Sequence, residues 1–240
     1  MGEHGIDGCR GIDCFLKNHT PAGANDVMLN PDKVQDLRKV GMTRVVDAGQ
    51  TVVFEGELSS NFVIVIDGVA LLAKTLRDGR RQIVGLRFAP GIITPPSATR
   101  PMHISAATKL EICLIPSSVM DELVCKSHEL AAEVIKSICD DLEESREWLL
   151  AIGRKSAVER LASFLIIIAR WQYGGLQDGF RLTLPISRAD LSDFLALTIE
   201  TTSRTLGRLR TMRVIEVENV QTIVVLDATR LERLSVGPDN

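Results

Sequence analysis

Apolar and polar residues change their spacing several times along this chain of 240 residues. Residues 1–30 show little periodicity and hold several Gly and Asn, so we expect a loosely ordered segment there. Between residues 43 and 115 the pattern becomes one of short apolar or alternating runs, such as TVVF, FVIVI, VALLA, QIVGL and LEICLI, separated by glycines. That pattern predicts an antiparallel β domain, which we assign to residues 31–116.

A helical pattern begins after Pro116, and we expect Ser118 and Asp121 to cap its first turn. The stretch from about residue 127 to residue 152 contains no Gly or Pro, which predicts one long helix. Gly153 is expected to end this helix and to provide a hinge. We assign residues 117–153 to a helical connector and a dimerisation helix.

Apolar and small residues in the long helix recur alternately four and three positions apart. The period of 3.5 is that of a coiled coil, and the charged residues around it favour a parallel homodimer. The alternative is an ordinary helix whose apolar side faces the core of its own chain. The positions are Ala131, Ile135, Ile138, Leu142, Ser145, Leu149 and Ile152.

Residues 154–240 have the pattern of a winged helix-turn-helix domain. The stretch RKSAVERLASFLIIIARWQYGG predicts a helix closed by two glycines. Ser187 can cap a short helix that runs through Leu195, and a second short helix begins near Thr198. RVIEVE and QTIVVLD then predict a two-stranded wing before a short charged helix. The expected fold class is therefore α+β.

The second short helix has two chemically different sides when it is drawn at 100° per residue. We expect one side to pack into the domain, namely Ile199, Thr202, Leu206 and Leu209. The other side is expected to face outward, with Glu200, Ser203, Arg204 and Gly207. Arg can bond bidentately to guanine, Glu can accept from cytosine N4, and Ser can reach several base edges in the major groove. The alternative is a solvated helix face with an ordinary Glu200–Arg204 pair.

Polar residues that flank this face could hold DNA phosphates and fix the register without reading sequence. They are Ser187, Arg188, Thr198, Thr201 and Arg208. Charge is divided in a way that permits such contacts: residues 154–240 carry twelve Lys/Arg and ten Asp/Glu, although the net charge of the chain is −3.

Composition narrows the classes of protein further. No apolar run approaches the ~20 residues that cross a bilayer, so we expect a cytoplasmic protein without a membrane partner. The number of cysteines, five, is odd and does not suggest a disulfide framework. The sequence lacks a phosphate-binding glycine loop, an HExxH motif and a GxSxG motif, and we expect no enzymatic activity.

From about residue 31 onward, the order of elements and the stretch LTIETTSRTLGRLR resemble the CRP/FNR superfamily of bacterial transcription regulators. The E-x-x-S-R signature formed by Glu200, Ser203 and Arg204 is similar to that of the FNR and FixK branches. The resemblance implies a β-roll like a cyclic-nucleotide-binding jelly roll, and a homodimer that binds a TTGA-N6-TCAA-type palindrome in double-stranded DNA. Glu200 and Arg204 would contact its G·C pair and Ser203 a neighbouring T. It also implies recruitment of RNA polymerase and gene control, as an activator, that responds to oxygen, nitric oxide or redox state. The alternative is a sensor of the same fold in which binding of a small molecule, an iron-sulfur cluster or haem is the main activity.

The resemblance also bears on cofactors. Pro95 and Pro96 stand where relatives that bind cyclic nucleotides have Gly-Glu, and Ile104 stands where they have Arg, so we do not expect a cyclic nucleotide. Arg100, four residues away, could substitute only with a different loop. We assign no cofactor firmly.

An iron-sulfur cluster and haem remain alternatives. Cys113 falls at the distal ligand position of iron-sulfur relatives, and Cys9 with Cys14 could add two more ligands. The alternative is a packed strand cysteine and two exposed thiols. His4, His19 or an acidic residue would have to complete a cluster, and the remaining histidines are His103 and His128.

Overall fold

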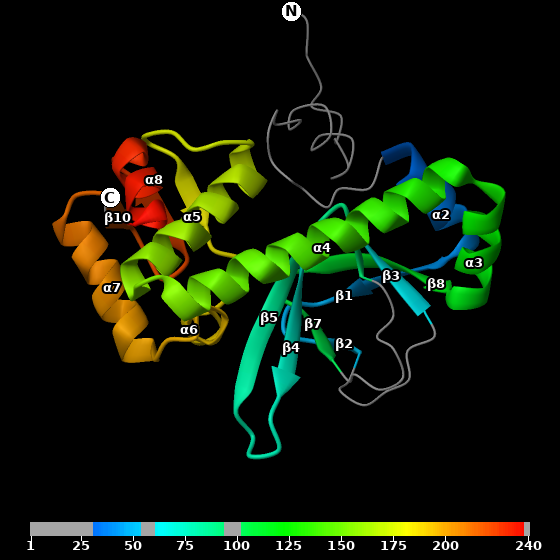
Figure 1. The fold of residues 1–240 in the computed structure, drawn as a ribbon, viewed down its shortest axis with the longest axis horizontal. Coiled ribbons are helices and arrows are strands. Elements are labelled where there is room, and N and C mark those ends of the chain that lie inside the picture. Colours follow the sequence, from blue (N-terminus) through cyan, green and yellow to red (C-terminus); the bar gives the residue numbers. More distant parts are fainter. Residues whose placement is uncertain (1–30, 54–60, 94–101, 238–240) are drawn as a thin grey trace, which may run out of the picture.

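The computed structural model describes residues 31–53, 61–93 and 102–237. Its fold class is the expected α+β: a β-roll, a long helix and a helical domain with a small sheet (Figure 1). The roll is built from α2 (Pro31–Val40), β1 (Met42–Val46), β2 (Thr51–Val53), β3 (Asn61–Asp67), β4 (Val69–Thr75), β5 (Arg81–Phe88), β6 (Gly91–Ile93), β7 (His103–Ala106) and β8 (Leu110–Pro116).

The strands of the roll form two antiparallel sheets, ordered β1-β8-β3-β6 and β2-β7-β4-β5. The side chains of β4 point alternately to the two sides of its sheet, which shows how the sequence positions this sheet in the molecule. Ala70 and Leu72 point between the two sheets, whereas Val69, Leu71 and Ala73 point to the opposite side and join the core of the C-terminal domain. The roll therefore shares a continuous apolar core with the domain that follows it.

Helix α2 was not predicted from the sequence. It is short and mostly polar, and Val34 and Leu37 are its buried apolar residues among those whose side chains are described. With α3 (Ser117–Lys126), it covers the outer face of the β1-β8-β3-β6 sheet around Ile64, Cys113 and Met120. The predicted segment 1–30 lies outside the described residues.

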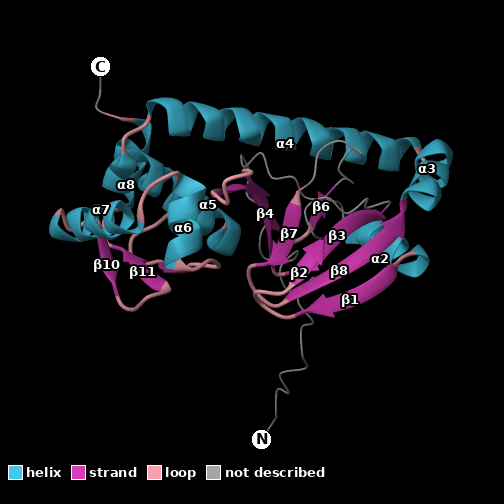
Figure 2. Ribbon diagram, turned by 90° about the horizontal axis from the view of Figure 1, so that it is seen from below, coloured by secondary structure: helices cyan, strands magenta, loops and turns pink. Residues whose placement is uncertain are grey.

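Helix α4 (His128–Arg154) runs along both halves of the molecule (Figures 1 and 2). Ser127 caps it by accepting a hydrogen bond from the Leu130 amide at 3.2 Å. Two details of the prediction were wrong. Ser118 caps nothing, because α3 already begins at Ser117 after Pro116 without a side-chain cap. Gly153 lies inside α4, because the chain stays helical until it becomes extended at Lys155.

The C-terminal domain surrounds the buried helix α5 (Ala157–Tyr173). Ser156 and Glu159 form a capping box at its start, and Gly174 ends it in the left-handed region at φ 72°. The elements that follow are β9 (Arg181–Thr183), α6 (Arg188–Leu195), α7 (Ile199–Thr211), β10 (Ile215–Val217), β11 (Thr222–Val225) and α8 (Ala228–Val236). The predicted wing strands pair as expected, and β9 adds a third strand. None of the described helices is long and apolar enough to cross a bilayer.

Candidate nucleic-acid interface

Helices α6 and α7 form a helix-turn-helix whose local geometry follows from its capping residues. Ser187 caps α6 by accepting from the Asp190 amide at 3.1 Å, and Thr198 caps α7 by accepting from the Thr201 amide at 3.2 Å. Ala196 closes α6 in the left-handed region at φ 53°. The buried Ser192 and Thr202 hydroxyl oxygens lie 2.9 Å apart and connect the two helices.

The inner side of α7 is close to the prediction, with one error. Thr202, Leu206 and Leu209 are buried. Ile199 was expected beside them, but its side chain is 52% exposed. It opens the helix, and because helical side chains lean toward the N-terminus, Ile199 extends past the end of α7 and not over the buried face.

The outer side of α7 presents the predicted group of residues. Glu200, Ser203, Arg204 and Gly207 are all exposed. A Cβ atom placed on Gly207 would meet nothing within 4 Å, so the backbone there is open to a close approach. These residues therefore share one uncovered face of α7, and the backbone at Gly207 on that face is accessible.

The two charged groups of this face are held in different ways. The pKa of Glu200 is lowered by its own backbone amide, then by the Thr198 hydroxyl and Arg204, so its carboxylate is a charged acceptor at neutral pH. Arg204 donates from Nη2 to Thr201 Oγ1 at 3.2 Å. Glu200 and Arg204 therefore interact through their charges across one turn of α7, while the guanidinium of Arg204 makes its hydrogen bond to Thr201.

Four of the residues expected to hold phosphates lie at the start of α6 or α7, and the fifth, Arg208, lies in the last turn of α7. Ser187 and Thr198 are exposed N-caps, Thr201 is half-buried in the first turn of α7, and Arg208 is exposed. Arg188 is half-buried, burial lowers its pKa, and its Nη1 atom has no hydrogen-bond partner among the described residues. Two helix N-termini, which favour anions, thus lie beside these side chains.

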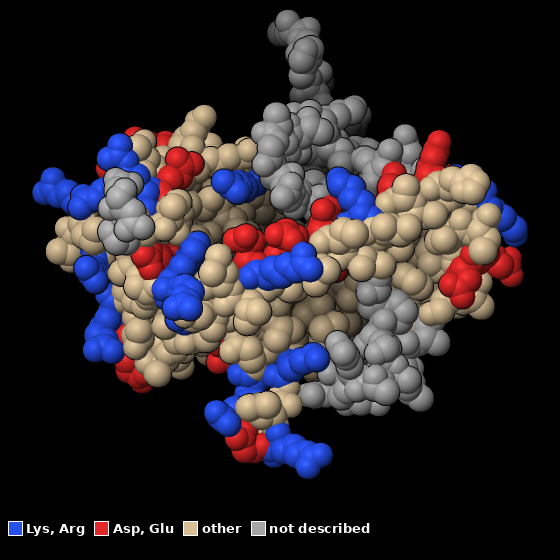
Figure 3. All heavy atoms as spheres, viewed as in Figure 1, with Lys and Arg blue, Asp and Glu red and all other residues tan. Residues whose placement is uncertain are grey.

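Basic side chains gather at the end of the molecule that carries α7 and α8 (Figure 3). Arg208 of α7 and Arg230 and Arg233 of α8 line a cleft of about 680 Å³ there. Glu159 and Asp227 line the same cleft, so its lining carries three cationic groups and two carboxylates.

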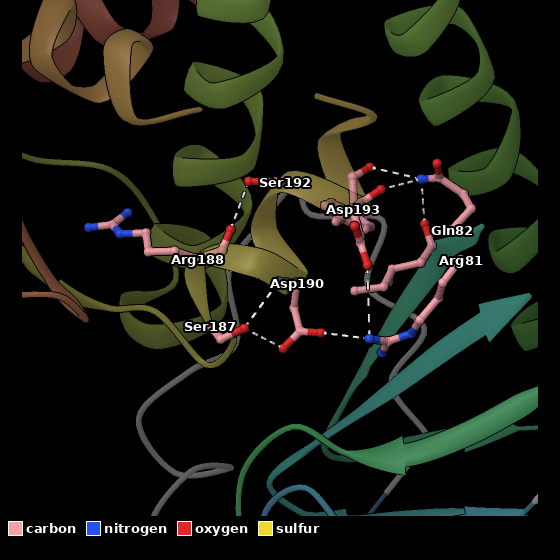
Figure 4. Close-up of polar contacts among 9 residues, drawn as sticks. Arg81, Gln82, Ser187, Arg188, Asp190, Ser192 and Asp193 are labelled. Atoms are coloured by element: carbon pink, nitrogen blue, oxygen red, sulfur yellow. Dashed lines mark hydrogen bonds and ion pairs between the residues drawn. The ribbon is translucent and has the colours of Figure 1, made fainter. Parts of the chain in front are cut away.

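Three further polar residues belong to this region and were missed in the sequence. Asp190 receives the Ser187 hydroxyl at 2.6 Å and at the same time pairs with Arg81 of β5 at 3.0 Å (Figure 4). Gln82 donates to backbone carbonyls at the end of α6. Arg81 and Gln82 could not be found by local patterns, because more than a hundred residues separate them from α6.

The predicted coiled-coil positions of α4 form an apolar stripe on its outer surface. Ile135 is 61% exposed, Leu142 50% and Leu149 73%, whereas Val134 and Trp148 on the adjacent side of the helix are buried. The stripe therefore does not serve the core of this chain, which disfavours the alternative of an ordinary core-facing helix.

The cysteines do not form a ligand set within the described residues, where no group of three or more His, Cys, Asp or Glu could hold a metal. Cys113 is fully buried, burial raises the pKa of its thiol, and its Sγ lies 3.7 Å from Leu37 O. A thiol packed in this way does not fit the role of a thiolate ligand. Cys125 of α3 and Cys139 of α4 are exposed. Cys9, Cys14, His4, His19, Pro95, Pro96 and Arg100 lie outside the described residues.

Comparisons with known proteins agree with the geometry. The Crp-like helix-turn-helix domain family matches residues 159–234, and the cyclic nucleotide-binding domain family matches residues 43–127. A probable transcriptional activator of Rhizobium leguminosarum bv. viciae is 37% identical over 92% of this chain and 91% of its own. The transcriptional activator protein FnrL of Cereibacter sphaeroides is 33% identical over 91% and 89%.

Among solved structures, FixK2 from Bradyrhizobium japonicum matches with a TM-score of 0.74 and 26% identity, over 83% of this chain and 100% of that one. The β-roll, the helix-turn-helix and the full-length relatives lead to one conclusion. The protein belongs to the CRP/FNR superfamily, in its FNR/FixK-like branch, and is a DNA-binding transcription regulator and not an enzyme.

Proposed function

We propose that the protein binds, as a homodimer, a two-fold symmetric DNA site of the TTGA-N6-TCAA type. The observation that carries this proposal is the uncovered face of α7, with Glu200, Ser203 and Arg204 side by side and Gly207 beyond them. A helix of this kind fits the major groove, where each base pair presents a distinct pattern of donors and acceptors.

Each side chain has a chemically suitable partner in that site. Arg204 can donate two hydrogen bonds to guanine O6 and N7, and the charged carboxylate of Glu200 can accept from N4 of the paired cytosine. Ser203 can meet a neighbouring T. To reach the base, Arg204 would give up its hydrogen bond to Thr201, which lies one turn away on the same helix.

Phosphate contacts would fix the position of α7 in the groove. Ser187 and Thr198 lie at the positive ends of α6 and α7, Arg188 adds charge at the start of α6, and Arg208 adds charge in the last turn of α7. The partly unsatisfied guanidinium of Arg188 supports a role for it in binding an anion. These contacts would strengthen binding to any sequence and carry no base preference.

The exposed stripe of α4 supports the homodimer. Pairing two copies through Ile135, Leu142 and Leu149 would bury side chains that water now covers. Two recognition helices related by a two-fold axis must reach successive major grooves about 34 Å apart, so the pairing of α4 would set the spacing of the half-sites.

The proposed function includes a response to a signal. Membership of the FNR/FixK-like branch supports control of genes that respond to oxygen, nitric oxide or redox state, with RNA polymerase as a partner. No group of three or more His, Cys, Asp or Glu in the described part of the chain could hold a metal ion, and Cys9 and Cys14 lie outside that part, so the iron content and absorption spectrum of protein purified without oxygen are the direct measurement.

The DNA proposal is tested by gel shift with a TTGA-N6-TCAA duplex and duplexes changed at each position. Arg204→Ala should weaken binding by ~1–3 kcal/mol and relax the preference at the contacted G·C pair. Arg213→Ala, at an exposed arginine after α7, is the matched control and should leave that preference intact. Equal preference in the Arg204→Ala variant and the wild type would refute the proposed base contact.

The homodimer is tested by light scattering on Leu142→Glu. A charge in the stripe should give monomers and abolish binding to the palindrome, because a buried unpaired carboxylate opposes association. Lys136→Glu introduces the same side chain at an exposed position of α4 outside the stripe and should remain dimeric. A dimeric Leu142→Glu variant would exclude this pairing surface.

A further inference from the structure

The first helix of the helix-turn-helix is held between its own domain and the β-roll. Helix α6 lies against β5, and Phe194 and Leu195 share one apolar core with Ile83 and Leu86 of that strand. Trp148 of α4 meets Phe194 edge to face, with ring centroids 4.3 Å apart. The position of α6 therefore depends on the roll as well as on the DNA-binding domain.

Gln82 of β5 acts on the C-terminal end of α6. Its Nε2 atom donates to the carbonyl of Asp193 and lies 3.5 Å from that of Phe194 (Figure 4). The last carbonyls of a helix have no partner within it, and an unpaired buried carbonyl is costly. Arg160 of α5 satisfies the next carbonyl, that of Leu195, at 3.0 Å. Hydrogen bonds from the roll and from α5 thus hold the same end of α6, where Asp193 O also accepts the Ala196 amide at 3.3 Å.

Arg81, the neighbour of Gln82, acts on the acidic side of α6. Its Nη1 atom lies 3.0 Å from Asp190 Oδ1 and 3.9 Å from Asp193 Oδ2. Asp190 also accepts the hydroxyl of Ser187, the N-cap that is expected to meet a phosphate. The carboxylates of Asp190 and Asp193 thus lie on the helix whose N-cap is expected to meet a phosphate, and the positive charge of Arg81 offsets their negative charge.

We propose that Arg81 and Gln82 are positioning residues for DNA binding, although they belong to the β-roll. Arg81 offsets the repulsion between the phosphodiester and the carboxylates of Asp190 and Asp193. Gln82 holds the end of α6 so that Ser187 and Arg188 face the DNA backbone. This inference rests on the proposed function, because it assumes that the start of α6 meets a phosphate.

The arrangement gives the roll a direct effect on DNA affinity that does not pass through α4. A cleft of about 700 Å³ lies at this junction, lined by Arg81, His103 and Ser105 from the roll and by Ser187, Asp190 and Gln221 from the DNA-binding domain. A shift of β5 would change the charge beside Ser187 as well as the orientation of α6.

The experiment measures the affinity of full-length Arg81→Ala for the TTGA-N6-TCAA duplex and for a scrambled duplex. We expect a loss of about three- to tenfold on both, because a partly exposed charge near a phosphate acts on every sequence. The preference at the G·C pair should stay unchanged. Arg80→Ala is the matched control, because Arg80 is exposed in the same hairpin and pairs with Asp78 of that hairpin.

A double-mutant cycle separates electrostatic positioning from general damage. Asp190→Asn keeps an acceptor for Ser187 but removes the charge, so adding Arg81→Ala to it should cost less than Arg81→Ala alone. Equal losses in both backgrounds would overturn the proposal for Arg81. Gln82→Ala should weaken binding to both duplexes and leave the dimer intact, and an unchanged affinity would overturn the role of Gln82.

Other results would also overturn the proposal. A loss in Arg80→Ala as large as in Arg81→Ala would mean that the hairpin touches DNA by its charge alone. Tighter binding by Arg81→Ala would mean that the ion pair holds α6 in an inhibited position. Failure of the proposed function itself is seen separately, as an unchanged base preference in Arg204→Ala.

Discussion

Strand β5 carries an arginine ion pair near each end, and the two arginines differ in their separation from water, whereas the two aspartates are exposed to a similar degree. Arg87 pairs with Asp141 of α4, and these side chains are 9% and 29% exposed. Arg81 pairs with Asp190 of α6, and these are 36% and 26% exposed. The same kind of ion pair therefore connects β5 both to helix α4 and to the helix-turn-helix.

The difference in burial decides what each pair does. Burial raises the pKa of Asp141 even though Arg87 lowers it, and Arg87 Nε has no hydrogen-bond partner among the described residues. Hydrogen bonds and charge within the Arg87–Asp141 pair therefore do not fully offset the cost of burying these groups, and removing one partner leaves the other without its opposite charge. The Arg81 pair is closer to solvent, so it contributes little to folding and can serve function.

The largest expected effect comes from breaking the buried pair. Arg87→Ala should lower the free energy of unfolding by ~2–4 kcal/mol, because it leaves the Asp141 carboxylate half-buried and unpaired. Denaturant unfolding measures the change. Replacing both partners, in Arg87→Met with Asp141→Leu, should return stability to within about 1 kcal/mol of the wild type. A variant with only Arg87 replaced that is as stable as the wild type would show that the pair is not coupled.

A smaller effect is expected in the dependence of stability on pH. The pKa of Asp141 is raised above its ordinary value of 3.8 in the folded protein. Between these two pKa values the folded state binds more protons than the unfolded state. The contribution of Asp141 to the free energy of unfolding therefore falls as pH rises to the folded pKa. Arg87→Ala removes the main influences that lower this pKa, so the fall should extend to higher pH. Unfolding measured from acid to neutral pH should show the variant losing more stability than the wild type. Parallel curves would contradict this assignment.

The sequence predicted the parts of the molecule that are set by neighbours along the chain. The outer face of α7 follows from helical period and the Thr198 cap, and the α4 stripe follows from a spacing of 3.5. Helix α2 was missed because Val34 and Leu37 are too few to show a period. The contact of Arg81 with Asp190 could not be predicted, because only the packing of β5 on α6 brings the two residues together. The helix-turn-helix could thus be predicted, but not the contact that supports it.

The smallest expected effect on stability comes from Arg81, at the other end of β5. Arg81→Ala should lower the free energy of unfolding by less than about 1 kcal/mol, because an exposed pair is solvated and screened. Raising the salt concentration from 0.05 to 0.5 M should remove most of this difference, since the screening length falls to a few ångströms, whereas the loss in Arg87→Ala should persist. Denaturant unfolding of both variants at the two salt concentrations makes the comparison. If the Arg81 variant instead lost as much stability as the Arg87 variant, and lost it at high salt as well, the pair would be a structural contact and its effect on DNA affinity would follow from damage to the fold.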